Sequence, residues 1–166
     1  KEVCCSVSHN IPMTITLDKD TFIGRGSMNL KPGSVSTLTK YIVYTDSIRH
    51  KGCQQIGIEL LSKVLKEDVA FWFKSQEVYL NKFWKYSKIS IPAKPVVEQS
   101  LNYSIYQLLA SAGKDIHSNI AAKGLSGEGY EGHYFWDTEV YMLPFFTLTN
   151  PEIAKNLLLF RHETLD

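Results

Sequence analysis

Apolar positions along the chain change their spacing near residue 55, and this change predicts two kinds of secondary structure. Residues 11–45 are rich in threonine, valine, isoleucine and tyrosine, with a Lys-Pro-Gly turn signal at 31–33. This composition predicts two or three β-strands, two of them near Thr14–Leu17 and Val35–Tyr44. So few strands cannot bury both faces of a sheet, so we expect them to need further partners.

From about residue 55 onward, apolar residues recur at helical spacing, which predicts helices packed against a core. The segment from Gln55 to about Tyr86 predicts one long helix or two short ones, with Leu61, Val64, Leu65 and Trp72 facing that core. A cleaner stripe over Val97–Ala112 predicts a further helix. Its apolar members are Leu101, Ile105, Leu108, Leu109 and Ala112.

Two more helices are predicted in the last 30 residues of the chain. One begins at Thr138 with Asp137 as its cap, and Pro144 is expected to kink it. The other has Asn150 at the cap and Pro151 in the first turn, and it buries Ile153, Leu157 and Phe160. Strands thus precede helices, which predicts an α+β chain with a seam near residues 92–95.

Composition and charge narrow the function classes. The 166 residues include 18 Lys+Arg and 17 Asp+Glu, so no net field favours nucleic acid, and we expect no nucleic-acid partner. No apolar stretch approaches the roughly 20 residues of a membrane-spanning helix, so no membrane partner is expected. Three cysteines without a Cys-x-x-Cys pair indicate reduced thiols in a cytoplasmic protein rather than a disulfide framework or a zinc site.

The most unusual segment is residues 122–144, which combines glycines with aromatic residues. Its glycines cost backbone entropy, which favours a loop that turns sharply or approaches a ligand closely. Gly127–Gly132 matches the dinucleotide-binding fingerprint, but the required strand is missing and Glu128 and Glu131 would repel a pyrophosphate. The match is therefore interpreted as coincidental.

Trp136 and Asp137 form the candidate substrate-binding pair. A sugar needs a flat apolar surface for its C–H bonds and a carboxylate that accepts hydroxyl protons, and this pair supplies both. Tyr130, His133 and Phe135 are candidate neighbours in the same pocket. The alternative is that the indole belongs to the core and the carboxylate only caps a helix.

This segment also contains candidates for metal binding and for acid catalysis. His133 and Asp137 stand four residues apart, but two ligands do not make a closed site, so no metal is expected. Glu139 is the alternative catalytic acid. However, the positive end of the helix dipole favours its charged form, so a structural role is preferred.

The string from Ala122 to Phe146, followed by Thr149–Leu159, strongly resembles glycoside hydrolase family 65, which includes maltose, trehalose, kojibiose and nigerose phosphorylases. The resemblance is specific over residues 100–166 and looser before them. It implies the end of an N-terminal β-sandwich over 1–54, a helical linker over 55–96, and the first helices of a catalytic α/α barrel over 97–166. It also implies a homodimer in the complete enzyme.

The resemblance implies an inverting phosphorylase that cleaves an α-glucoside of maltose type with inorganic phosphate, giving β-glucose 1-phosphate and glucose. Phosphate is then a co-substrate and no cofactor is needed. The family's Trp-Asp pair binds glucose and falls on Trp136 and Asp137. The family's general acid lies in a later Gly-Pro-Asp-Glu-Tyr motif, which these residues lack, so no catalytic residue is expected in this chain and we expect it to be inactive alone. The alternatives are a stand-alone carbohydrate-binding or interaction module and a family hydrolase that uses water.

Overall fold

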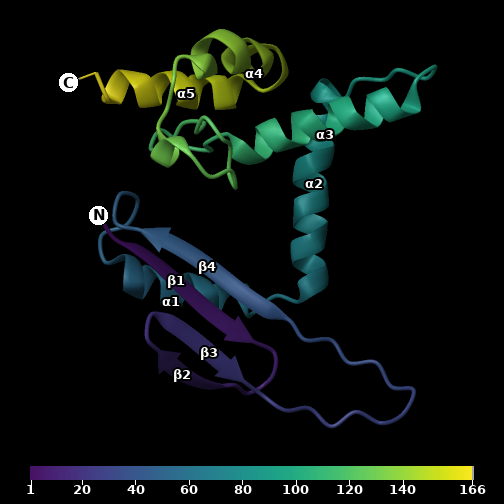
Figure 1. The fold of residues 1–166 in the computed structure, drawn as a ribbon, viewed down its shortest axis with the longest axis vertical. Coiled ribbons are helices and arrows are strands. Elements are labelled where there is room, and N and C mark those ends of the chain that lie inside the picture. The colour runs from purple at the N-terminus through teal and green to yellow at the C-terminus, as the bar shows by residue number, and fades with distance from the viewer. Residues whose placement is uncertain (166) are drawn as a thin grey trace. The chain divides into compact units, whose positions relative to one another are not determined.

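The computed structural model describes residues 1–165 and divides into two compact units, coloured along the chain in Figure 1. The first unit spans Lys1–Trp72 and the second begins at Phe73, so the division falls within α2 (Val69–Ser87). All four strands lie in the first unit, whereas the second unit is helical over its described residues. The predicted mixture of strands followed by helices is confirmed.

The first unit contains two antiparallel pairs of strands. β1 (Val3–His9) pairs with β4 (Lys40–Asp46), and β2 (Thr14–Asp18) pairs with β3 (Thr21–Arg25). The strand predicted near Thr14–Leu17 is confirmed. The one predicted over Val35–Tyr44 begins five residues later, at Lys40, because residues 35–39 have no regular structure.

α1 (Cys53–Val64) packs on one face of the β1–β4 pair, as Figure 1 shows. The approach is close because Gly57 has no side chain. A Cβ there would lie 2.7 Å from Ser6 Oγ and 3.0 Å from Thr45 Oγ1. The opposite face of this pair carries exposed apolar side chains, namely Val3, Val7, Ile42 and Tyr44.

The segment after residue 55 forms two helices, α1 and α2, which is one of the two predicted arrangements. Asp68 Oδ1 accepts a hydrogen bond of 2.7 Å from the Phe71 backbone N–H, which stabilises the start of α2. The prediction that Leu65 and Trp72 face a core is wrong, because they are 45% and 38% exposed. Among residues 1–165, no helix or strand packs over the Leu65 and Trp72 side chains closely enough to bury them.

The second unit is built from part of α2 together with α3 (Pro95–Ser111), α4 (Leu143–Thr149) and α5 (Pro151–Glu163). α4 and α5 pack side by side, and Phe146 of α4 is fully buried. The core comprises Phe83, Ile105, Leu109, Ala112, Ile120, Phe146, Ile153, Ala154 and Leu157. None of the helices found in residues 1–165 is long and apolar enough to cross a bilayer.

The helical predictions for this unit hold in most details. Ile105 and Leu109 of α3 and Ala112 directly after it are buried, as expected. α5 begins at Pro151 with Asn150 at the N-cap position, as predicted, although the Asn150 side chain makes no capping hydrogen bond. The helix at Thr138 starts as a π-helical segment, η2 (Thr138–Met142), and becomes α-helical next to Pro144, which lacks the N–H of a regular helix.

Candidate functional site

The glycine-rich loop contains a strained turn. Gly129, Tyr130, Glu131 and Gly132 have φ angles of 113°, 52°, 49° and 75°, so four consecutive residues lie in the region that favours glycine. This conformation is unfavourable for Tyr130 and Glu131, which have a Cβ. The backbone N–H and Nδ1 of His133 both lie 2.8 Å from the Tyr130 carbonyl oxygen, and these contacts hold the turn closed.

The loop ends at a corner where the chain enters η2. The Trp136 carbonyl accepts hydrogen bonds from the backbone N–H groups of Glu139, at 3.1 Å, and Val140, at 3.2 Å. Asp137 occupies the N-cap position of η2, as predicted, but it already has helical angles, φ −53° and ψ −34°, and its side chain makes no capping bond. Within the described part of the chain, no hydrogen bond or ion pair engages its carboxylate.

Asp137 lies in the wall of a cavity of about 370 Å³, which is within the roughly 300–1,000 Å³ range of ligand pockets. The strained turn and the corner bring Tyr130 and Phe135 to the same cavity. Three of the five predicted site residues therefore share one space. The full lining is Ile120, Ala122, Lys123, Tyr130, Phe135, Asp137, Thr138 and Met142.

The aromatic wall of this cavity is a packed pair. The Tyr130 and Phe135 rings meet edge to face, with centroids 5.3 Å apart and an interplanar angle of 79°. Lys123 Nζ lies 5.5 Å from the centroid of the Tyr130 ring, close enough for a cation–π contact. Sequence reasoning missed Lys123, although it lies inside the glycine-rich window. The cavity thus combines an apolar surface, one cation and one free carboxylate.

Trp136 and His133 lie near this cavity in sequence but are not among its lining residues. The Trp136 side chain is 62% exposed and lies beside Tyr141, with ring centroids 5.9 Å apart. His133 Nδ1 must donate to the Tyr130 carbonyl, because a carbonyl oxygen only accepts, which leaves Nε2 of the neutral ring as an acceptor. Their roles in sugar binding stay predictions.

Glu139 is held differently from Asp137. Arg161 of α5 binds the Glu139 carboxylate with two of its three guanidinium nitrogens, at 2.7 Å from Nε to Oε1 and 3.2 Å from Nη2 to Oε2. The same Nη2 donates to the Phe135 carbonyl at 2.9 Å. A carboxylate occupied by a guanidinium is a poor proton donor, so this geometry favours a structural role.

Among residues 1–165, no three His, Cys, Asp or Glu side chains come close enough to hold a metal ion. His133 and Asp137 do not face a common third ligand in this part of the chain.

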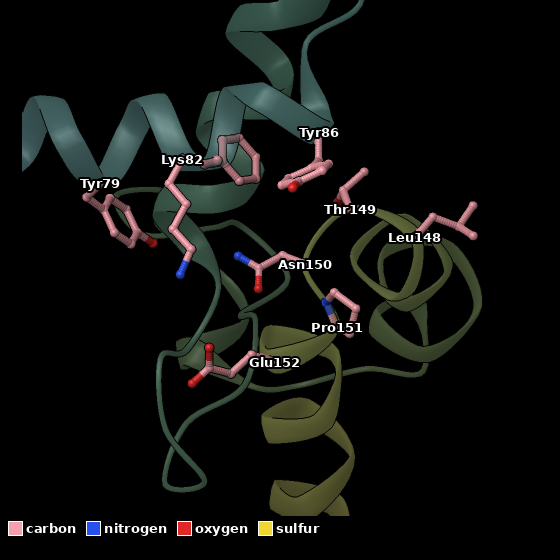
Figure 2. Close-up of a pocket in the computed structure, with 9 residues that line it drawn as sticks. Tyr79, Lys82, Tyr86, Leu148, Thr149, Asn150, Pro151 and Glu152 are labelled. Carbon is pink, nitrogen blue, oxygen red and sulfur yellow. The ribbon is translucent and has the colours of Figure 1, made fainter.

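A second cavity of about 460 Å³ lies elsewhere in the second unit, between α2 and the junction of α4 with α5. Figure 2 shows polar ends of Tyr79, Lys82, Asn150 and Glu152 around its opening. Burial raises the pKa of the Tyr79 hydroxyl above its usual range. This cavity shares no lining residue with the first one, and no sequence motif indicated it.

Comparison with known proteins places these features in a family. Residues 102–166 match the model of the glycosyl hydrolase family 65 central catalytic domain. The chain is 47% identical over 130 residues to an alpha,alpha-trehalose phosphorylase of Geobacillus stearothermophilus, covering 78% of this chain and 17% of that protein.

Two further relatives cover more of the chain. A kojibiose phosphorylase of Escherichia coli (strain K12) is 31% identical over 98% of this chain and 22% of its own length. A nigerose phosphorylase of Lachnoclostridium phytofermentans is 36% identical over 90% of this chain and 19% of its own length. The chain spans about a fifth of the length of these curated relatives, and the strained turn, the corner and the cavity all lie inside the matched domain. It belongs to glycoside hydrolase family 65.

Proposed function

We propose that this chain contributes part of the glucose-binding pocket of an inverting disaccharide phosphorylase. The main support is the position of the Asp137 carboxylate. It lines a cavity of ligand size, has no partner among the described residues, and shares that cavity with the packed rings of Tyr130 and Phe135. Sugar recognition requires a charged acceptor for hydroxyl protons beside an apolar surface. The relatives named as phosphorylases support the same class of substrate.

The proposed reaction divides its chemistry between this pocket and residues outside the chain. Inorganic phosphate is already anionic and attacks the anomeric carbon, so a phosphorylase needs one carboxylic acid to protonate the leaving oxygen and no general base. Glu139 is held by Arg161 and is unsuited to that task. We therefore propose that Asp137 and its neighbours bind the sugar, and that the chain by itself does not turn over.

We also propose a domain assignment that follows the resemblance. Residues 1–54 are the end of a β-sandwich, 55–96 are the linker, and 97–166 are the first helices of an α/α barrel. The exposed apolar face of β1 and β4, with Val3 75% and Tyr44 70% exposed, supports the first part, because a sandwich strand has a second sheet to pack against.

The substrate is proposed to be a glucose disaccharide with an α linkage. The sequence-based expectation was maltose, whereas the relatives described above are named for trehalose, kojibiose and nigerose. A panel of these four sugars, assayed with and without phosphate, separates the substrates. Release of glucose that does not require phosphate would identify a hydrolase instead.

Removal of the Asp137 charge tests the proposal in the complete enzyme. We expect Asp137→Asn to lower kcat/KM about 100-fold or more, because a hydrogen bond to a charged partner contributes more than one to a neutral partner. Trp136→Ala is expected to lower kcat/KM as well. Glu128→Gln is the matched control, since it removes an exposed carboxylate from the same loop. Near-normal kinetics of Asp137→Asn would contradict the assignment.

Glu139→Gln separates the two carboxylates. Because Glu139 is engaged by Arg161 outside the cavity lining, we expect kcat/KM to stay within about tenfold of the parent value. A loss as large as that of Asp137→Asn would return Glu139 to the list of catalytic candidates. For the 166-residue chain alone, any phosphate-dependent release of glucose 1-phosphate would refute the proposed inactivity.

A further inference from the structure

Two cysteines that are far apart in sequence meet where β1 packs on α1. Cys4 lies in β1 and Cys53 is the first residue of α1, and their Sγ atoms are 2.9 Å apart. This distance is about 0.9 Å longer than the roughly 2.04 Å of a disulfide bond. Both are free thiols; Cys53 is 1% exposed, whereas Cys4 is half-buried and partly open to solvent.

The backbone around the two thiols fixes their proximity. Thr45 pairs with Cys4 across the β1–β4 ladder, and its Oγ1 donates a buried hydrogen bond of 2.8 Å to the Cys53 carbonyl. One turn further along α1, Gly57 lets the helix approach the strands closely. The two sulfur atoms are therefore held together by the ladder, the buried hydrogen bond and the helix packing.

The surroundings of the pair are acidic rather than metal-binding. Cys53 Sγ lies 3.9 Å from Glu2 Oε2, and no third ligand completes a metal site within residues 1–165. The hydrogen bond with Cys53, followed by partial desolvation and nearby negative charge, raises the pKa of Cys4 to about 11. The Cys4 thiol is thus protonated at neutral pH in the absence of an oxidant, and it reacts faster as the pH rises.

We propose that Cys4 and Cys53 are a redox modification site that forms a reversible intramolecular disulfide with a low-molecular-weight disulfide, such as glutathione disulfide, as the oxidant. The Cys4 thiolate attacks one sulfur of the oxidant, forms a mixed disulfide and releases one thiolate. Cys53 then loses its proton and attacks the Cys4 sulfur, which releases the second thiol. Two protons and two electrons pass from the protein to the oxidant, which becomes two thiols.

The bond would join the second residue of β1 to the start of α1 and close a loop of about 50 residues. Cys5 does not take part, because alternation along the strand places its side chain on the opposite face. Cys5 instead contacts Tyr44, and this hydrogen bond raises the pKa of the Tyr44 hydroxyl. The three cysteines therefore divide into one reactive pair and one separate thiol.

The test uses the full chain and a Cys5→Ser variant that retains only the proposed pair. After incubation of Cys5→Ser with glutathione disulfide at pH 8.5, mass spectrometry should show a loss of about 2 Da without a bound glutathione. Proteolysis should yield a peptide that links Cys4 to Cys53. Alkylation of denatured Cys5→Ser should then modify neither of its two cysteines, and its thermal midpoint should rise by at least about 5 °C.

Cys53→Ser in the Cys5→Ser background is the matched variant, because it should stop at the mixed disulfide on Cys4. Three outcomes overturn the proposal in folded Cys5→Ser: glutathione that stays on Cys4 while Cys53 remains alkylatable, a disulfide only between two chains, or no reaction. In the parent, a bond between the adjacent cysteines Cys4 and Cys5 in place of the predicted link would also overturn it.

Discussion

The two units of this chain bury very different residues. In the first unit only Thr45, Cys53 and Gly57 are buried, whereas the second unit has a core of nine apolar residues. The first is held by close backbone approach and polar contacts, and the second by packed side chains. A binding cavity needs walls that stay in place, and the cavity that contains Asp137 lies in the unit that has the larger core.

The largest expected effect is on the core of the second unit. Phe146 is fully buried, so Phe146→Ala should lower the free energy of unfolding of that unit by about 3–5 kcal/mol through lost burial and the cavity left behind. Phe22→Ala is the control, because Phe22 of β3 is 76% exposed, and it should change stability by less than about 0.5 kcal/mol. Denaturant unfolding measures both. If Phe146→Ala and Phe22→Ala lowered the stability equally, the two units would not differ in how far packed side chains stabilise them.

A smaller effect is expected at the polar contact of the first unit. Thr45→Val keeps the shape of the side chain but removes the buried hydrogen bond to the Cys53 carbonyl, which should cost about 1 kcal/mol. Thr21→Val, at an exposed strand position, is the matched control. If Thr45→Val left the stability unchanged, this hydrogen bond would not hold α1 on the strands.

The smallest effect is a dependence on alkaline pH. The folded chain raises the pKa of Cys4 from 9.0 to about 11, chiefly through the hydrogen bond with Cys53, so between these values the folded state binds more protons than the unfolded state. Stability conferred by this group is therefore present below pH 9 and is lost as the pH rises toward 11. Unfolding curves of Cys4→Ser should lack this component. A parent and variant with parallel pH profiles would contradict the coupling.

The sequence predicted the second unit better than the first. The stripe over Val97–Ala112 and the Asn-Pro start of α5 gave clear helical signals, because apolar residues there face a core. β1 was missed because the residues on its covered face, Cys4, Ser6 and Ser8, are small or polar, whereas its apolar Val3 and Val7 are exposed. Small side chains let α1 approach the strand closely, but a sequence rich in small and polar residues resembles that of a loop.

Part of the local geometry around the candidate site was predicted, whereas the roles of its residues in sugar binding stay predictions. The glycine-rich window correctly indicated sharp turns, and Tyr130, Phe135 and Asp137 lie at one cavity. The sequence could not show that Arg161 occupies Glu139 or that Trp136 lies outside the cavity lining, because these depend on how α5 and η2 are placed. The meeting of Cys4 with Cys53 was equally invisible, since 49 positions separate them.

The most direct test of the sugar-binding assignment is a crystal structure of the complete enzyme with glucose or a substrate disaccharide bound. The account predicts sugar hydroxyl groups within about 2.5–3.0 Å of the Asp137 carboxylate oxygens, with Tyr130 or Phe135 against the apolar surface of the ring. A sugar bound at full occupancy elsewhere, with the Asp137 carboxylate turned to solvent, would contradict it.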